Sequence, residues 1–268
     1  MTNSVAVSGA HPVALVTGAS AGIGVEFAKR LAERGYDVIL SARRRERLVE
    51  LAARLRAEHG DVRVEVIVAD LSLPVAPAQI VAETARLGLH VDLLVNNAGF
   101  GTHGRFEALD ADRERCEIAV NVAALVALTH AYLPAMLERG SGGVINVAST
   151  AAFQPVPYMS VYGATKAFVR SFSEALHEEV RTRGVRVLAL CPGPTATEFF
   201  TSDVAAPRGP VRTVREVVTT GLRAYDAAVP LAIDGPSNRL LIALSSLIPR
   251  RWVTQMAGRI MHPATAKR

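Results

Sequence analysis

Short apolar runs alternate with longer amphipathic stretches along most of the chain. Six of the apolar runs are nearly continuous, which is typical of strands buried on both faces of a parallel sheet. The predicted strands are Val13–Thr17, Asp37–Ala42, Arg63–Ala69, Val91–Asn96, Gly143–Ser149 and Val185–Cys191. The stretches between them predict helices over Gly22–Arg34, Arg44–His59, Pro77–Leu87, Glu107–Arg139 and Pro157–Arg183. This alternation predicts an α/β fold, a doubly wound parallel sheet of the Rossmann type.

The pattern changes after the sixth predicted strand. Thr201–Val211 contains Pro207, Gly209 and Pro210 and predicts a loop near the carboxyl ends of the strands, where such sheets bind ligands. We interpret residues 1–268 as a single domain, with a core of about residues 12–235 and a small C-terminal helical extension over residues 236–268.

Composition limits the class of protein. There are 30 basic and 25 acidic residues, a formal charge of +5, but the basic residues are scattered and aromatic residues make up only 5%. This distribution argues against nucleic-acid binding. The two cysteines, Cys116 and Cys191, belong to no metal-spaced cluster, so no metal is expected. We see no secretory signal and no apolar run of the ~20 residues that cross a bilayer, which predicts a cytoplasmic protein.

A glycine-rich turn follows the first predicted strand and leads directly into a helix. It reads Thr17-Gly18-Ala19-Ser20-Ala21-Gly22-Ile23-Gly24. Free amides at a helix N-terminus attract phosphate, and the missing β-carbons let the backbone approach it closely. The spacing GxxxGxG differs from the commoner GxGxxG, and a tight turn without a ligand has a similar composition. Its place in the first strand–helix unit favours a pyrophosphate site.

Further motifs follow in order, each near the end of a predicted element. Asn96-Asn97-Ala98-Gly99 closes the fourth strand, and Pro192-Gly193 follows the sixth, with Thr195 and Thr197 behind it. Between them lie Asn121, Ser149, Tyr162 and Lys166, spaced 28, 13 and 4 residues apart. From about Val13 to Phe200 the chain resembles the short-chain dehydrogenase/reductase family. The resemblance implies an oxidoreductase that moves a hydride between a nicotinamide and a carbonyl/alcohol pair.

Tyr162 and Lys166 lie four residues apart in a predicted helix and therefore share one face. A free tyrosine has a pKa of about 10, and a nearby ammonium favours the phenolate, which would make Tyr162 a usable acid and base. Ser149 can donate a hydrogen bond to a carbonyl oxygen. The resemblance implies that Lys166 also binds the nicotinamide ribose and that Asn121 holds a proton-relaying water. Each residue alone also suits a structural role; their joint spacing favours catalysis.

The predicted cofactor site gathers residues from the ends of several strands. It comprises Gly18, Ser20, Gly22, Ile23, Gly24, Arg43, Asp70, Leu71, Asn96, Ala98, Gly99, Tyr162, Lys166, Pro192, Gly193, Thr195 and Thr197. NADP(H) is expected over NAD(H), because Ala42 stands where NAD-users carry an acid and Arg43 follows it. Arg43 can pair with a 2′-phosphate. Against this, the glycine turn has Ala21 where many NADP-users carry a basic residue.

Further residues near the ends of the second and third predicted strands are assigned to the same part of the cofactor. Ser41 is expected to add a hydroxyl contact to the ribose phosphate, and Asp70 to meet the adenine amino group. The alternative is that the arginines at positions 43–45 simply open a solvated helix. Of these arginines, we expect Arg43 to contact the phosphate.

The substrate side is expected to be apolar. Phe153, Gln154 and Tyr158 lie between Ser149 and Tyr162, and Phe199 and Phe200 follow the sixth strand. They predict a hydrophobic ketone and its secondary alcohol as substrates. Pro230–Gly235 followed by an apolar, basic tail resembles the branch of hydroxysteroid and long-chain acyl reductases rather than the acyl-carrier-protein ketoreductases. His177, fifteen residues after Tyr162, is expected to be a solvated side chain.

Two other functions are weighed against this one. A non-catalytic NADP(H)-binding sensor on the same fold is the main alternative, although such family members usually lose the Tyr/Lys pair. A sugar-nucleotide epimerase or dehydratase is the second alternative. It is disfavoured because it needs a larger C-terminal substrate lobe than the roughly 70 residues after Cys191 can form.

Two surfaces are expected to make further contacts. The two longest predicted helices carry apolar residues that predict a homodimer or homotetramer: Val161, Phe168, Phe172, Leu176, Leu125, Leu128 and Tyr132. The tail Asn238–Ile260 mixes leucines and Trp252 with arginines. Such a helix pair suits a cover over the substrate pocket, a subunit contact or a membrane surface, and we favour the first two.

Overall fold

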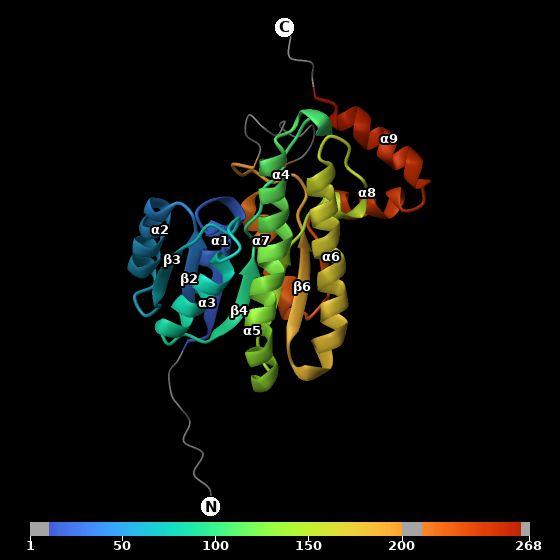
Figure 1. Cartoon of the computed structure of the whole chain (residues 1–268). Helices are drawn as coiled ribbons and strands as arrows, with labels where there is room; N and C mark the ends of the chain where they lie inside the picture. Colours follow the sequence, from blue (N-terminus) through green and yellow to red (C-terminus); the bar gives the residue numbers. More distant parts are fainter. Residues whose placement is uncertain (1–10, 200–210, 264–268) are drawn as a thin grey trace, which may run out of the picture.

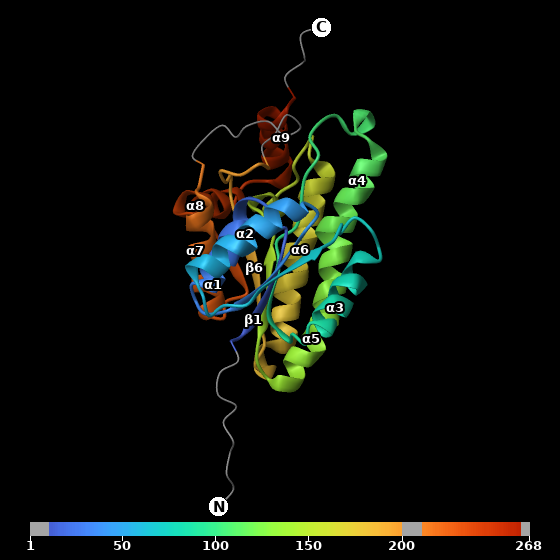
Figure 2. The same cartoon turned by 90° about the vertical axis from the view of Figure 1, so that its left-hand side faces the viewer.

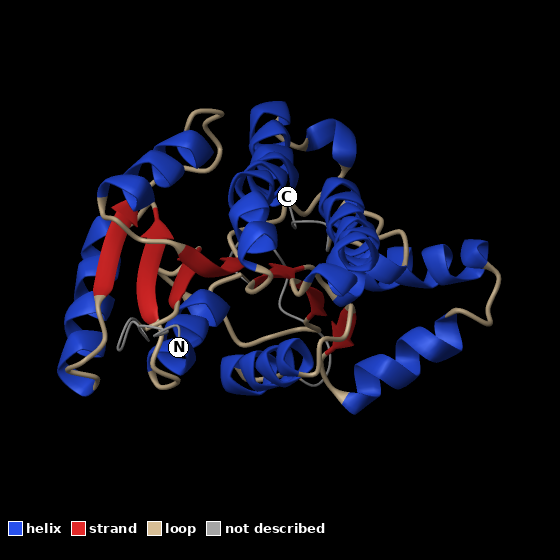
Figure 3. Cartoon of the chain, turned by 90° about the horizontal axis from the view of Figure 1, so that it is seen from below, coloured by secondary structure: helices blue, strands red, loops and turns tan. Residues whose placement is uncertain are grey.

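The computed structural model describes residues 11–199 and 211–263. Within them, seven parallel strands form one sheet in the order β3-β2-β1-β4-β5-β6-β7 (Figures 1 and 3). The strands are β1 Val13–Thr17, β2 Asp37–Ala42, β3 Val64–Val68, β4 Val91–Asn96, β5 Gly143–Val147, β6 Arg186–Cys191 and β7 Leu231–Ile233. The strand order reverses between β1 and β4, which is the switch point at which doubly wound sheets bind ligands. The predicted fold class is confirmed.

Helices cover both faces of the sheet (Figures 2 and 3). They are α1 Gly22–Ala32, α2 Arg45–Glu58, α3 Ala76–Arg86, α4 Ala111–Ile118, α5 Leu125–Arg139, α6 Ser160–Val180, α7 Val214–Asp226, α8 Pro236–Ser245 and α9 Arg250–Met261. Helices α1, α2 and α7 pack on one face through residues such as Phe27, Leu48 and Leu222. Helices α3 and α5 pack on the other through Ile80 and Leu128. The strands are apolar on both faces because both are covered.

Several predicted boundaries differ from the structure by one to four residues, and two of the differences have a clear local reason. β5 ends at Val147 because the chain turns, and the Ser149 hydroxyl then accepts a hydrogen bond from Ala151 N (3.1 Å) to cap the 3-10 helix Thr150–Phe153. The predicted helix Pro157–Arg183 begins only at Ser160, since Tyr158 has a left-handed φ of +66° that no α-helix accepts.

The predicted helix Glu107–Arg139 is interrupted. A 3-10 turn precedes α4, whose first turn is capped by Asp110 as its side chain accepts from Asp112 N (2.9 Å). Between α4 and α5 the chain forms a π-helix, Ala119–Ala124, and such bulges are frequent at functional sites. Asn121 lies in this π-helix.

The run Ala111–Arg139 is long and apolar enough to cross a membrane by length and composition alone. Leu128 and Met136 on this run are completely buried against the sheet, as in the core helix of a globular fold. Leu125 and Tyr132 are also at least 90% buried. The prediction that Leu125, Leu128 and Tyr132 offer apolar surface to another subunit is therefore wrong, because they fill the chain's own core. Phe168 on α6 is different: it is 42% exposed.

Helices α8 and α9 form a pair beyond the β7 edge, with α9 at the same end of the molecule as α4 (Figure 1). The end of α9 is tied to the body by a hydrogen bond between His103 Nε2 and Met261 O (2.8 Å) and by an edge contact of His262 on the Tyr158 ring (5.0 Å). Val253 and Ala257 face inward and are buried. The outward face stays open to solvent.

Candidate active site

The glycine turn forms a bare cradle at the N-terminus of α1. Gly18 and Gly22 have left-handed φ values of +66° and +55°, which glycine adopts without strain. A Cβ atom on Gly18 would lie 2.8 Å from Asn97 Nδ2, and one on Gly24 only 2.4 Å from Gly18 O. Ala21, at the N-cap, makes no side-chain hydrogen bond to the first turn. The cradle therefore fits a phosphate group that approaches the helix amides.

The end of β4 holds this cradle in place. Asn97 Nδ2 donates to Thr17 O (2.9 Å) and Gly18 O (3.3 Å), and Thr17 Oγ1 accepts from Asn97 N (3.0 Å) and Ala98 N (3.1 Å). Sequence reasoning quoted Asn97 within its motif without giving it a role. The indication of this structural role was its position at the end of the neighbouring strand, directly opposite the glycine turn.

Asn96 does not face the cradle. Its side-chain Nδ2 donates to Thr129 Oγ1 (3.1 Å) and to Asn146 Oδ1 (2.9 Å), all three residues being buried. Asn96 and Asn146 also pair in register on β4 and β5. The Asn96 side chain thus braces two strands and α5 from inside.

The ends of β2 and β3 form the next part of the site. Ser41 pairs in register with Thr17, and its hydroxyl is buried without a hydrogen-bond partner among the described residues. Arg43 is exposed beyond it. Burial would raise the pKa of Asp70, but hydrogen bonds from Ser72 N and Oγ (3.0 and 2.8 Å) and the charge of Arg43 hold it below its ordinary value. This corner therefore offers an exposed guanidinium and a half-buried carboxylate, while the Ser41 hydroxyl, which was expected to contact the ribose phosphate, is covered.

Arg44 is a residue that sequence reasoning left among the solvated arginines. Its Nε donates to Ser20 Oγ (3.2 Å) and its Nη2 to Ser20 O (3.3 Å), so it lies against the glycine turn. Glu198 pairs with both Arg44 (2.8 Å) and Arg47 (2.5 Å), which draws the segment after β6 toward α2. In the sequence, the only indication of this role was the run of arginines to which Arg44 belongs.

The segment after β6 lies across the glycine turn. A Cβ atom on Gly22 would lie 2.9 Å from Thr197 Cγ2, and Thr195 Oγ1 donates to Gly193 O (2.9 Å). Pro192 O accepts from Thr150 N (2.8 Å), which joins the segment to the turn after β5. The remaining predicted cofactor residues, Ile23, Leu71 and Ala98, pack against the two core clusters.

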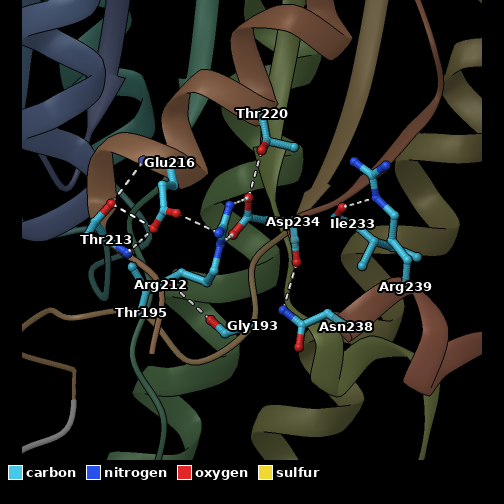
Figure 4. A network of polar contacts seen from close by, with 10 residues as sticks. All are labelled: Gly193, Thr195, Arg212, Thr213, Glu216, Thr220, Ile233, Asp234, Asn238 and Arg239. Atoms are coloured by element: carbon cyan, nitrogen blue, oxygen red, sulfur yellow. Dashed lines mark hydrogen bonds and ion pairs between the residues drawn. The ribbon is translucent and has the colours of Figure 1, made fainter. Parts of the chain in front are cut away.

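Figure 4 shows how the chain beyond this segment is fixed. Asp234, at the end of β7, is fully buried and receives two hydrogen bonds from Arg212 (2.9 and 3.2 Å) and one from Thr220 Oγ1 (2.7 Å). Arg212 N also donates to Pro194 O (2.8 Å). Asn238 Nδ2 donates to Asp234 O (2.7 Å) and reaches α8. The sequence analysis did not predict this network around Asp234, because no sequence motif indicates that a carboxylate is buried.

The four predicted catalytic residues meet at the carboxyl end of β5. Ser149 lies close enough to the Tyr162 hydroxyl to lower the pKa of the phenol. Lys166 Nζ donates to Val147 O (2.8 Å) and lies 5.8 Å from the Tyr162 ring centroid. A Cβ atom on Gly99 would lie 3.0 Å from Asn121 Oδ1 and 3.3 Å from Lys166 Nζ, so these groups face one small space.

Asn121 is held by the chain around it. Its Oδ1 accepts from Phe100 N (3.1 Å), while Nδ2 donates to Phe100 O (2.9 Å) and Thr165 Oγ1 (3.1 Å). The side chain therefore links the turn after β4 to α6. With its side-chain amide engaged in this way, a relay through Asn121 would have to use its backbone.

Lys166 was expected to lower the pKa of Tyr162, but the structure favours a raised pKa. Burial raises the pKa of Tyr162 to about 12, although nearby Ser149 opposes the shift. Burial also lowers the pKa of Lys166 to about 8. Lys166 bonds to Val147 O and faces the phenol ring rather than its hydroxyl, so its charge does not offset the loss of water. A phenol in this state stays protonated and is suited to donate a proton.

The Tyr162 ring packs in an apolar cluster, called the apolar wall below. Val156 and Met159 are buried there, with Phe199 and Met261 packed against them, and the Phe199 ring lies 5.3 Å from the Tyr162 ring. Met261 comes from the end of α9 and was not predicted. Phe200 lies outside the described residues.

Phe153 was expected at this wall but packs elsewhere. It belongs to a separate cluster around Leu125 and Val169, with the Arg170 guanidinium 4.5 Å above its ring. The 3-10 helix Thr150–Phe153 turns its side chain under α6, a geometry that residue spacing cannot give. Gln154, next in the chain, is extended and half-buried, while Tyr158 contacts His262.

His177 is also corrected. It is half-buried, and its Nδ1 makes a hydrogen bond with Val187 O of β6 (3.0 Å). The residue therefore fastens α6 to the sheet instead of pointing into water. Within residues 11–199 and 211–263, no group of three or more His, Cys, Asp or Glu side chains is placed to hold a metal ion.

A bare glycine cradle at the switch point of a parallel sheet, beside a Tyr–Lys–Ser cluster, is the arrangement of a dinucleotide-dependent dehydrogenase. A family model of the short chain dehydrogenases matches residues 12–207. The chain belongs to the short-chain dehydrogenase family, which confirms the resemblance noted above.

Individual relatives agree with this assignment. Sulfoacetaldehyde reductase 2 of Chromohalobacter salexigens is 39% identical over 190 residues, covering 70% of this chain and 74% of that protein. Very-long-chain 3-oxoacyl-CoA reductase of Rattus norvegicus is 36% identical over 190 residues, covering 69% of this chain and 60% of that protein.

Two solved structures are similar over nearly the whole chain. A short-chain dehydrogenase from Sphingobium yanoikuyae in complex with NADPH has a TM-score of 0.79 and 35% identity, covering 96% of this chain and 98% of that one. A bulky-bulky ketone specific alcohol dehydrogenase from Comamonas testosteroni has a TM-score of 0.75 and 31% identity, covering 96% of both chains. The protein is thus an oxidoreductase that acts on CH–OH and C=O groups with a nicotinamide cofactor.

Proposed function

We propose that the protein interconverts hydrophobic ketones and their secondary alcohols with NADP(H), and that Tyr162 is its acid/base. The observation that carries the proposal is the convergence of Asn121, Tyr162 and buried Lys166 near the end of β5, with Ser149 close to the phenol and an apolar cluster around its ring. A sensor that only binds the cofactor would not need this cluster, so the enzyme is favoured over the sensor.

In the reduction direction, Ser149 donates a hydrogen bond to the carbonyl oxygen and Tyr162 gives that oxygen its proton. The bound nicotinamide supplies the hydride. The raised Tyr162 pKa keeps the phenol protonated until the oxygen gains charge. In this proposal Lys166 bonds the nicotinamide ribose, and Asn121 holds the water through which the proton on Tyr162 is restored.

The glycine cradle would hold the pyrophosphate, and the end of β2 would select NADP(H). No carboxylate stands at Ala42, while Arg43 is exposed and Arg44 lies against Ser20 of the glycine turn. A 2′-phosphate suits two guanidinium groups far better than does a plain ribose. Asp70 is assigned to the adenine. The NADPH in the Sphingobium yanoikuyae relative supports the same preference.

The apolar wall favours a bulky, uncharged substrate. Val156, Met159, Phe199 and Met261 carry no charge, and burial of apolar substrate surface against them contributes roughly 25 cal/mol per Å². The relatives named for a bulky-bulky ketone and for a very-long-chain 3-oxoacyl-CoA support this class. The sulfoacetaldehyde reductase would favour a small, charged carbonyl compound instead, for which this wall offers no partner.

Assembly and location are part of the proposal. Phe168 stacks on Phe172 (5.9 Å between centroids) and stays 42% exposed on α6, which favours a homo-oligomer through this helix. Light scattering on Phe168→Asp should return a smaller mass than the parent. A cytoplasmic location is favoured because Cys116 and Cys191 are both free thiols.

The test of the function is NADPH oxidation over a panel of ketones graded by size. Catalytic efficiency should rise from small to bulky ketones and exceed that for a charged aldehyde such as sulfoacetaldehyde. Tyr162→Phe should abolish most of this turnover. Activity confined to small charged carbonyl compounds would refute the substrate class, and no oxidation with any compound would favour the sensor.

A further inference from the structure

Glu117 is a buried acidic side chain beside the candidate active site, and none of the steps above uses it. It lies on α4, one turn before Asn121, and is fully buried. Its Oε2 accepts hydrogen bonds from Thr102 N and Thr102 Oγ1, both 2.9 Å. Its Oε1 is equally buried and has no hydrogen-bond partner among the described residues.

Such a carboxylate is costly to the fold. Burying a charge with an unsatisfied oxygen disfavours the native state unless a nearby opposite charge offsets it. Burial therefore raises the pKa of Glu117 to about 7, against the hydrogen bonds from Thr102. Because Oε1 makes no bond, a proton can add there without breaking one. A residue retained against stability in this way points to a use in the site.

The charged groups around Glu117 come from two helices. Lys166 on α6 attracts the carboxylate, while Glu114 on α4 repels it. The charge of Glu117 in turn favours the ammonium form of Lys166 and opposes the phenolate form of Tyr162. Cys191 also acts on Lys166, but burial raises its thiol pKa to about 12, so it is neutral when Glu117 is charged. The turn after β4 brings Glu117 close to Lys166, because Thr102, which binds Glu117, lies three residues after Gly99, at which a Cβ atom would lie 3.3 Å from Lys166 Nζ. Of Cys191 and Glu117, Glu117 is therefore the nearby group that is charged at pH 8.

Lys166 needs an anion. Its pKa is already lowered to about 8 by burial, so a further loss of favourable charge would leave it neutral at mildly alkaline pH. A neutral amine donates weaker hydrogen bonds than an ammonium. Its bond to Val147 O and its proposed bond to the ribose both depend on that charge.

We propose that Glu117 is a positioning residue whose buried carboxylate keeps Lys166 protonated and so extends catalysis into the alkaline range. The proposal rests on the proposed roles of Tyr162 and Lys166. It gives Glu117 no contact with substrate or cofactor, only an electrostatic effect through Lys166.

The first test is the pH profile of kcat for Glu117→Gln. Glutamine keeps the size and an oxygen for the Thr102 donors but carries no charge. Near pH 6 the parent carboxyl is mostly protonated, so the two enzymes should agree within about twofold. Above pH 8 the variant should lose about tenfold, with its alkaline limb moved about one pH unit lower and with KM for the ketone little changed. Glu114→Gln, on the same helix, is the matched control and should keep the parent profile.

The second test is thermal stability without cofactor or substrate. Because the Glu117 pKa is raised from 4.5 to about 7, the folded state binds an extra proton between these values and loses stability as pH rises through them. Glu117→Gln should therefore melt several degrees above the parent at pH 8, by about 2–4 °C for a chain of this size, with no such gain at pH 4. A carboxylate with a purely structural role would give the opposite sign at pH 8.

The outcomes separate this proposal from the function itself. An alkaline limb unchanged in Glu117→Gln, or shifted equally in Glu114→Gln, overturns the role of Glu117. Should Glu117→Gln not fold, Glu117→Met, which fills a similar volume, takes its place in the pH profile with the same expectation; its melting temperature is not compared, because Thr102 then loses its acceptor. If Tyr162→Phe keeps full turnover, the proposed function fails whatever Glu117 does.

Discussion

Helix α5 and the pair α8–α9 are both rich in apolar residues, yet they bury very different shares of them. On α5, Leu128 and Met136 are completely covered by the sheet. On α8 no residue is buried, and on α9 only Val253 and Ala257 are. Leu247, between the two helices, is 81% exposed. The lesson is that apolar composition gives a helix its potential for packing, while the neighbouring elements decide whether it is used.

This difference in burial indicates different roles for the two regions. The sheet and its helices hold the site rigidly, since every predicted catalytic residue is fixed by buried hydrogen bonds or core packing. The pair α8–α9 touches the site where Met261 joins the apolar wall, where His103 bonds its backbone, and where Asn238 lies against Gly193. We therefore expect changes in the body to cost stability, and changes in the tail to alter substrate use.

The largest contrast should come from matched leucines. Leu128→Ala opens a cavity against the sheet and should lower the free energy of unfolding by about 3 kcal/mol. Leu247→Ala removes a side chain already in water and should change it by less than about 0.5 kcal/mol. Urea unfolding measures both. Equal losses would mean that the tail is packed in solution against something else, such as another subunit.

The junction between the regions should come next. Arg212→Ala leaves buried Asp234 without its paired guanidinium and should cost about 2 kcal/mol, less than for a fully buried pair because Arg212 is partly exposed. It should also raise KM for NADPH, because the lost ion pair with Asp234 no longer anchors the backbone that bridges to Thr195. Arg215→Ala, an exposed neighbour, is the control. A loss in Arg215→Ala equal to that in Arg212→Ala would remove the network from the account.

Arginines of the two regions can be compared directly. Arg43→Ala should lower catalytic efficiency with NADPH by roughly 10- to 100-fold and leave NADH almost unchanged, because a charge-assisted pair contributes ~1.5–3 kcal/mol. Arg251→Ala in the tail should change neither. Arg44→Ala reports whether the arginine on the glycine turn shares the phosphate. A parent enzyme that prefers NADH would remove the assignment for both.

The smallest effect is expected at the tip of the tail. Met261→Ala shortens the apolar wall and should raise KM for a bulky ketone by ~3- to 10-fold, about 1 kcal/mol of lost apolar contact. Stability should hardly move. Met256→Ala, on the outward face of the same helix, is the control and should leave KM unchanged. Steady-state kinetics and urea unfolding on the same two variants check both statements.

The sequence predicted the sheet well because buried parallel strands leave continuous apolar runs that few other structures produce. It also named residues that the fold brings together, since Asn121, Ser149, Tyr162 and Lys166 converge although 45 positions separate the first from the last. Such spacing reports a conserved arrangement of strand ends rather than any local preference.

What the sequence could not give depends on tertiary packing. Glu117 has the pattern of a solvated helix residue, and only the contact of α4 with α6 buries it. Phe153 follows Ser149 closely, but a 3-10 turn points it away from Tyr162. The direction of the Tyr162 pKa shift reversed because burial outweighs a lysine that faces the ring. These outcomes are set by orientation, which residue spacing does not encode.

The central claim is that Tyr162 gives the proton while a nicotinamide gives the hydride. It is tested most directly with NADPH deuterated at the transferring carbon and a bulky ketone, following deuterium into the alcohol by mass spectrometry in the parent and in Tyr162→Phe. The account predicts transfer to the carbinol carbon in the parent and a rate at least ~10²-fold lower in the variant, with NADPH binding and folding retained. Deuterium transfer at a near-parental rate in Tyr162→Phe would contradict it.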